Sequence, residues 1–298
     1  MIAECGCEAK GMTLSGPSLV ELRFLNVKTP SEIWKKCVKA QEDWEKQRSS
    51  LGKEAEQMKE YEKKMTVELI WLTNTLEDTL PKGLSKKKVD EVLTKAYDRV
   101  DDLPYVDEPG IGQLIQHLKA FKNLCQTPKG SNSLPELSED LIKETHQIMM
   151  RGLKNEQGMA INAGAYRVSS VCAGGHTFPS YTCIPNSMAR IVKEYNDKFS
   201  KPHDRYELAS WLYFNVVSLH PFEDGNGRIS RLLWCYSLIR DGQPFPTVLT
   251  TGYKRSQKHL VLCLKRDRDL LISNNPHLTT LTVVSVNQAW EGYFDMFG

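Results

Sequence analysis

The sequence has no apolar run long enough to cross a bilayer as a helix, which needs about 20 residues. It also has almost no net charge: 39 Lys and Arg face 37 Asp and Glu, for a net charge of +2, and the two signs are interleaved. We therefore expect binding to neither nucleic acid nor membranes. The first residues, MIAECGCEAKGMTL, lack the basic and apolar parts of a secretory signal, which favours the cytoplasm or the nucleus.

The eight cysteines are scattered along the chain, and they do not form two pairs with the spacing of a structural zinc site. Cys5 and Cys7 make a single Cys-x-Cys pair. We expect reduced thiols rather than disulfides or a zinc centre.

Helical signals dominate and predict a mainly α-helical fold. Forty per cent of the 298 residues are apolar, which is enough for a substantial core. The expected helices begin near Ser31, Lys53 and Ser138 and cover 85–101, 111–124, 187–199, 206–219 and 227–240. The segment 158–183 is rich in glycine and has short Val, Cys and aromatic runs, so it is expected to be an extended loop or hairpin.

The helix expected after Lys53 carries an apolar stripe. Its members recur every three or four residues and are Met58, Tyr61, Met65, Leu69, Leu72 and Leu76. Thr73 and Glu77 lie four residues apart, so they share a face one step round from this stripe. Taken alone, Glu77 is more typical of a solvated side chain near the end of a helix.

The densest group of reactive side chains is HPFEDGNGRISR, residues 220–231. Pro221 disfavours helical geometry at the residue before it, so one helix should end at His220, a base near neutral pH. The triplet 225–227, Gly-Asn-Gly, should open the next helix. Free N–H groups and the positive end of the helix dipole make such a start a natural anion site.

Charged side chains flank this junction. Arg228 and Arg231 lie three residues apart on one helical face and can reach separate oxygens of a polyphosphate. Asp224 offers the carboxylate oxygens that Mg²⁺ prefers. A Gly-Asn-Gly turn or a His-Pro pair alone is usually structural, but together with these charges they indicate phosphoryl or nucleotidyl transfer.

The segment resembles the signature of the Fic (Fido) family, His-Pro-Phe-x-(Asp/Glu)-Gly-Asn-Gly-Arg-x-x-Arg, at every fixed position. The resemblance extends over about residues 134–262. It implies a Fic-type helical bundle with a short β-hairpin flap, preceded by N-terminal helices. The expected domain limits are 1–30 for an N-terminal segment, 31–105 for an N-terminal helical region and 106–298 for a Fic catalytic domain.

By this resemblance the chain is expected to move AMP from ATP to a Ser, Thr or Tyr hydroxyl of a target protein. The family pattern makes His220 the base that deprotonates the hydroxyl, and makes Asp224 the ligand of Mg²⁺ or Mn²⁺. It assigns the γ-phosphate to Arg231. It assigns the α- and β-phosphates to four consecutive residues, Gly225, Asn226, Gly227 and Arg228.

The flap, roughly Val168 to Tyr181, is implied to clamp the target protein by main-chain pairing. Without the resemblance it would be interpreted as an ordinary surface hairpin. Cys235 stands where many relatives have an Asn that helps to fix the nucleotide, which leaves the base preference open. Whether the chain forms a homodimer is also left open.

Residues 73–77 are similar to the family's inhibitory motif, (Ser/Thr)-x-x-x-Glu-(Gly/Asn), with Thr73 and Glu77 at its ends. There the Glu pairs with the second motif arginine, here Arg231, and keeps the γ-phosphate of ATP from binding productively. Asp78 departs from the Gly or Asn of the pattern, adds negative charge and weakens the match.

Three alternatives remain open at this point. The enzyme could use another donor, such as phosphocholine from a CDP-linked compound or another nucleotide. It could remove AMP, with Glu77 activating water. The chain could instead hold a nucleotide without turnover and act as an interaction protein, although a retired site has no need of His220.

Overall fold

The computed structural model describes residues 53–100, 110–128, 133–155, 158–173 and 176–247. Ten isolated positions are also described: 39, 103, 130, 131, 249, 261, 264, 265, 267 and 268. The helix expected from Ser31, the Cys5–Cys7 pair and the segment 1–30 lie outside the described residues. One compact unit contains the described residues 63–246, and the candidate site belongs to it. The domain limits 31–105 and 106–298 stay a prediction.

In the part of the chain that the structure describes, the fold is mainly helical with one short hairpin, as predicted. The helices are α3 (Lys53–Leu76), α4 (Lys86–Tyr97), α5 (Ile111–Cys125), α6 (Glu139–Met150), α7 (Ile184–Phe199), α8 (Arg205–Leu219) and α9 (Asn226–Arg240), with a 3-10 turn at Tyr181–Cys183. The strands β1 (Cys172–Ala173) and β2 (His176–Thr177) pair in antiparallel register. Among the described residues, no helix is both long and apolar enough to span a membrane.

Side-chain caps define where several helices begin. Ser85 and Ser138 accept backbone N–H groups in the first turns of α4 and α6, and Asp204 accepts two at the start of α8. Each cap satisfies an N–H that has no intrahelical partner. Ser85 and Ser138 stand at the helix starts that the sequence predicted. The sequence placed the start of α8 at 206 and did not identify Asp204 as its cap.

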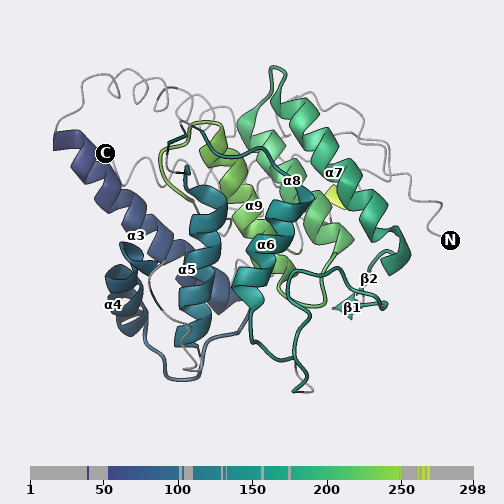
Figure 1. Cartoon of the computed structure of the whole chain (residues 1–298), viewed down its shortest axis with the longest axis horizontal. Coiled ribbons are helices and arrows are strands. Elements are labelled where there is room, and N and C mark those ends of the chain that lie inside the picture. Colours follow the sequence, from purple (N-terminus) through teal and green to yellow (C-terminus); the bar gives the residue numbers. More distant parts are fainter. Residues whose placement is uncertain are drawn as a thin grey trace, which may run out of the picture. The chain divides into compact units, whose positions relative to one another are not determined.

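Helices α8 and α9 form the centre of the unit, where they pack against each other (Figure 1). The apolar residues of α8 are almost all buried, as expected for 206–219. Helix α9 is buried nearly all round and includes Trp234 and Tyr236. Helix α7 packs on α8, while α5 and α6 pack on α9 and on each other. The α8–α9 junction is therefore held rigidly from several sides.

Besides the α8–α9 centre, a second cluster of buried residues joins α4 and α5 to the C-terminal half of α3. Val67 and Ile70 of α3 belong to it, and Trp71 packs against it. The apolar stripe predicted on this helix is thus only partly correct. Thr66, Thr73 and Asn74 are fully buried as well, because helices cover more than one face of this stretch.

Candidate active site

The junction between α8 and α9 is built on two left-handed residues. His220 caps the C-terminus of α8 with φ 53° and ψ 59°, and Gly225 precedes α9 with φ 74°. A positive φ is uncommon for a residue other than glycine and indicates a position fixed by its surroundings. The short loop between them brings His220 beside the N-terminus of α9, as the sequence predicted.

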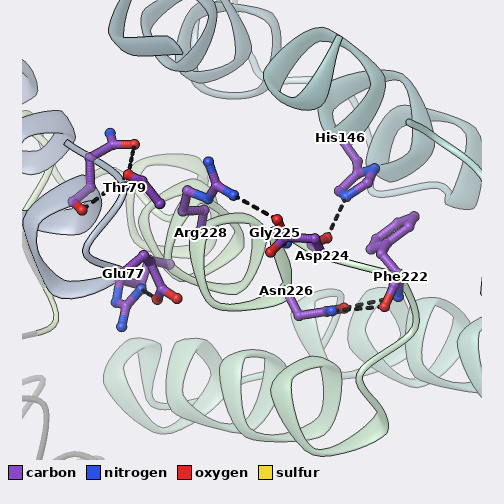
Figure 2. A network of polar contacts seen from close by, with 10 residues as sticks. Glu77, Thr79, His146, Phe222, Asp224, Gly225, Asn226 and Arg228 are labelled. Atoms are coloured by element: carbon purple, nitrogen blue, oxygen red, sulfur yellow. Dashed lines mark hydrogen bonds and ion pairs between the residues drawn. The ribbon is translucent and has the colours of Figure 1, made fainter. Parts of the chain in front are cut away.

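Asn226 closes this loop. Its side-chain amide donates to the carbonyl of Phe222 and accepts from the N–H of Phe222, both at 2.9 Å, and the residue is 2% exposed. Figure 2 shows this pair of hydrogen bonds beside the first turn of α9. The side chain of Asn226 therefore holds the loop in shape.

His146 of α6 braces the same loop from the other side. Its Nδ1 accepts from the N–H of Gly164 at 2.9 Å, so the neutral ring carries its proton on Nε2 and donates to the carbonyl of Asp224 at 2.9 Å. Burial lowers the pKa of His146 to about 4, which keeps it neutral. The ring also stacks on Phe222, with centroids 3.7 Å apart.

The flap is fastened to the junction by Arg167, which is 5% exposed. Its guanidinium donates to the carbonyls of Ser169 and Pro179, one in each arm of the flap, at 2.7 and 2.6 Å. It also donates to the carbonyl of His220 at 2.7 Å. One buried arginine thus ties both arms of the hairpin to the end of α8.

The flap also reaches the ring of His220. Phe178 stacks on this imidazole with centroids 3.9 Å apart. Burial lowers the pKa of His220 to about 4, and the positive charge of Arg167 acts in the same direction. The imidazole is therefore neutral at pH 7 and able to accept a proton.

Arg228 and Asp224 lie at the start of α9 (Figure 2). Arg228 is 2% exposed, and its Nη2 is 3.6 Å from Oδ2 of Asp224. Oδ1 of Asp224 accepts the N–H of Gly225 at 2.5 Å. The carboxylate side chain is 52% exposed, so oxygen lone pairs remain available to a cation.

Within the described part of the chain, no group of three His, Cys, Asp or Glu side chains could hold a metal ion. Magnesium commonly uses one or two carboxylates together with substrate phosphates and water. A single exposed carboxylate at an anion-binding helix start fits that mode of binding.

Glu77 follows the last residue of α3 and contacts Arg231. Oε1 of Glu77 accepts from Nη1 of Arg231, which is 3% exposed, whereas the Glu77 side chain is 29% exposed. Burial alone would raise the pKa of Glu77, but the charge and hydrogen bond of Arg231 outweigh it, helped by Arg228 and His220, and the pKa is lowered. The carboxylate is therefore charged and occupies a donor of the second motif arginine.

Asp78 explains why glycine or asparagine suits the position after Glu77. It has φ 53°, and the N–H groups of Asp78 and Thr79 bond back to the carbonyls of Thr75 and Asn74 at 3.2 and 3.1 Å. These two bonds define a Schellman motif, in which this position is left-handed and favours Gly or Asn. The departure at Asp78 therefore concerns backbone conformation, since its side chain is exposed.

Two other residues singled out in the sequence are fully buried. Thr73 is fully buried, and its hydroxyl has no hydrogen-bond partner in the part of the chain that the structure describes. Cys235 is fully buried within α9.

Known proteins are similar to this chain in sequence and in fold. A model of the Fic/DOC family matches residues 136–238. A Fido domain-containing protein from Dictyostelium discoideum is 33% identical over 130 residues, which cover 41% of this chain and 91% of that protein. The chain belongs to the Fic/DOC family.

Protein adenylyltransferases named Fic are also similar. The protein from Drosophila persimilis is 31% identical over 138 residues, which are 46% of this chain and 26% of the relative. The one from Drosophila grimshawi is 34% identical over the same length, 28% of the relative. This chain thus matches only about a quarter of the length of these adenylyltransferases.

Two solved structures share the fold. A Fic domain containing signaling protein from Bacteroides thetaiotaomicron has a TM-score of 0.64 at 20% identity, covering 90% of this chain and 94% of that one. A segment of Fic-1 from C. elegans has a TM-score of 0.64 at 19% identity, covering 90% of this chain and 72% of that one. Both support a Fic fold for the described helices.

Sequence reasoning missed Arg167, His146 and Phe178. Each contacts the junction from a loop or helix that lies far from residues 220–231 in the sequence. No local pattern marks a buried arginine or histidine as a brace. Only the three-dimensional neighbours of the motif could have found them.

Proposed function

We propose that the chain is a self-inhibited protein adenylyltransferase. It moves AMP from ATP to a Ser, Thr or Tyr hydroxyl of a target protein, and Glu77 is its brake. The single observation that carries this proposal is the contact of Glu77 with Arg231 at the start of α9, beside the neutral imidazole of His220.

His220 accepts the proton of the target hydroxyl. The hydroxyl oxygen then forms a bond to the α-phosphorus of ATP, and the bond from that phosphorus to the bridging oxygen breaks, releasing pyrophosphate. A neutral base near the anion site supports this step. Phe178 covers the imidazole and limits the access of water to it.

The first turn of α9 is suited to the phosphates. Its N–H groups at 226–228 have no intrahelical carbonyl to bond, and the helix dipole favours negative charge there. Arg228 and Arg231 add two guanidinium groups that can each bond phosphate oxygens in a fork. Asp224 would hold Mg²⁺ or Mn²⁺, which neutralises phosphate charge when bound.

The flap supplies a site for the target protein. Strands β1 and β2 form a two-stranded sheet, in which each strand has one outer edge. An extended segment of the target could add main-chain hydrogen bonds at such an edge. Val168 is 82% exposed and Tyr181 is 40% exposed at the two ends of the predicted flap. Apolar side chains of the target could contact them.

Glu77 keeps the enzyme at rest because its carboxylate and the γ-phosphate of ATP compete for Arg231. A hydrogen bond to a charged group contributes about 1.5–3 kcal/mol, which converts to roughly tenfold to hundredfold in the population of the open site. Weakening the contact should therefore raise the rate by about that factor.

The test is transfer of label from [α-³²P]ATP, with Mg²⁺ or Mn²⁺, to the chain itself and to added candidate target proteins. We expect label to rise roughly tenfold or more in Glu77→Gly and Glu77→Gln, and to disappear when His220→Ala is added. Glu68→Gln is the matched control, since Glu68 lies on the same helix and pairs with Lys86 at 2.9 Å instead. It should leave labelling unchanged.

Absence of label in Glu77→Gly under all these conditions would contradict the proposal. If ATP still binds in calorimetry but no pyrophosphate forms, the chain is a nucleotide-binding interaction protein. A competition series with CTP, GTP, UTP and CDP-choline separates AMP transfer from use of another donor. Loss of AMP from a pre-labelled target would identify the reverse reaction.

A further inference from the structure

The turn that carries Glu77 is closed by bonds between the residues on either side of it. The N–H of Thr79 donates to the carbonyl of Asn74 at 3.1 Å. The hydroxyl of Thr79 lies 3.1 Å from both the carbonyl oxygen and Oδ1 of Asn74. The position of Glu77 is therefore set by where Asn74 and Thr79 are held.

His117 of α5 holds the first of these two residues. The amide nitrogen of Asn74 donates to the carbonyl of Ile70 at 2.7 Å and to Nδ1 of His117 at 2.8 Å. Asn74 is 0% exposed and His117 is 1% exposed. Burial lowers the pKa of His117 to about 3, so Nδ1 remains a neutral acceptor for this bond.

Gln113, one turn earlier on the same face of α5, holds Thr79, the second of these two residues. Only one orientation of its amide satisfies both neighbours: the nitrogen donates to the carbonyl of Thr79 at 3.3 Å, and the oxygen accepts from Nη1 of Arg228 at 2.5 Å. Gln113 and His117 lie four residues apart, so they face the turn together. Figure 2 shows Thr79 and Glu77 on one side of Arg228.

We propose that Gln113 and His117 are positioning residues for Glu77: they fix the two ends of its turn and thereby set the contact between Glu77 and Arg231. Gln113 also links the turn to Arg228, the other arginine of the motif. The link to inhibition rests on the proposed function, whereas the positioning itself does not.

The hydrogen bond between Asn74 and His117 explains why α5 can hold the turn in place. Replacing His117 by an apolar residue leaves a buried N–H of Asn74 without its acceptor, which is more costly than the loss of an exposed hydrogen bond. The chain can recover that bond only by moving Asn74 and the turn. His117→Asn keeps an acceptor near the place of Nδ1, whereas His117→Leu removes it.

The first measurement is amide hydrogen exchange in the folded full-length protein, over a peptide that covers residues 74–80. We expect His117→Leu to accelerate exchange there about fivefold, as the loss of one net hydrogen bond does to a two-state opening. His117→Asn should restore slow exchange. Gln116→Leu is the matched control, since buried Gln116 donates to the carbonyl of Arg151 at 2.6 Å on the same helix.

Unchanged exchange at 74–80 in His117→Leu, or the same acceleration in Gln116→Leu, would overturn the proposal. If His117→Leu does not fold, Thr79→Val removes only the hydroxyl bond to Asn74 and should accelerate exchange over the same peptide. Unchanged exchange in Thr79→Val would overturn it equally.

The second measurement is labelling from [α-³²P]ATP. With Glu77 present, His117→Leu and Gln113→Leu should raise labelling about fivefold, while Gln116→Leu should not. In the Glu77→Gly background His117→Leu should add nothing, because the brake is already absent. An equal rise in both backgrounds would show an effect on catalysis and overturn the role in braking.

The two measurements separate the two proposals. If Glu77→Gly itself carries no label, the proposed function fails. Exchange at 74–80 still decides whether α5 positions the turn of Glu77.

Discussion

Glu77 lies so close to Gly227 that no other residue fits at position 227 while the carboxylate stays in place. A Cβ at this position would overlap Oε1 of Glu77 and lie 2.9 Å from its Cδ and 3.2 Å from Nη1 of Arg231. Gly227 is therefore a requirement of the inhibited arrangement as well as of the anion site, since absence of a side chain lets another group approach the backbone closely.

A double-variant cycle on stability tests this relationship. Gly227→Ala should destabilise the protein while Glu77 is present, because the new methyl group displaces the carboxylate. In the Glu77→Gly background the same change should be neutral or stabilise by up to about 1 kcal/mol, the difference in helix propensity between Gly and Ala. Urea unfolding of the four proteins measures both values, and equal effects in the two backgrounds would show that Glu77 does not occupy this space.

Replacing Asp78 by glycine should stabilise the protein. Its φ of 53° costs a non-glycine residue about 1 kcal/mol, so Asp78→Gly should raise the free energy of unfolding by about 0.5–1 kcal/mol. Asp78→Ala removes the same charge without relieving the backbone, and it should not stabilise. If both variants stabilise the protein equally, the negative charge of Asp78, and not its backbone conformation, is what destabilises the protein at this position.

Arg167→Lys should loosen the flap although it conserves charge. A lysine cannot reach the carbonyls of Ser169, Pro179 and His220 together, so buried acceptors lose their donors. We expect a loss of about 2–4 kcal/mol in stability and faster amide exchange at 168–181. Arg190→Lys, a half-exposed position of α7 that pairs with Glu194 on its own helix, is the control and should change stability by less than about 0.5 kcal/mol. Unchanged exchange in the flap of Arg167→Lys would contradict this role of the arginine.

The contribution of His117 to stability should depend on pH. Its pKa is about 3 in the folded protein, below the ordinary histidine value of about 6.5, so the unfolded chain binds the proton more readily. The stability that neutral His117 contributes is complete above about pH 6.5 and is lost as pH falls towards 3, at about 1.4 kcal/mol per pH unit.

The pH dependence due to His117 has to be measured as a difference between two proteins, because Glu207 also titrates. Burial and the charge of Asp204 raise the pKa of Glu207 to about 7, so its contribution grows as pH falls and opposes that of His117. The stability difference between wild type and His117→Asn cancels this shared term. It should shrink steadily between pH 6 and pH 4, and a constant difference would show that His117 is not buried in its neutral form.

Much of the site follows from residues that are neighbours in the chain. Pro221 ends α8 at His220, and the glycines that follow start α9, so a loop of a few residues must keep the base near the arginines. The cap Ser138 was equally predictable, because a cap acts on N–H groups two or three residues away.

The braces of the site were not predictable in this way. His146 and Arg167 contact the junction across 78 and 53 residues of chain, respectively. On α3, periodicity located an apolar stripe but missed the burial of Thr73 and Asn74. Periodicity describes one apolar face, whereas burial on the other faces depends on which helices pack there. Asn74, for example, is buried against His117 of α5.

The sequence by itself determined which chemistry is available: a base, an acid, an anion-binding helix start and two arginines within twelve residues. Short-range geometry is enough for this, because covalent spacing keeps these groups together. The resemblance already paired Glu77 with Arg231, and the structure shows that contact. Only the tertiary structure decided that Gln113 and His117 face the turn that carries Glu77. Those relationships join helices whose packing, not their spacing in the chain, brings the side chains into contact.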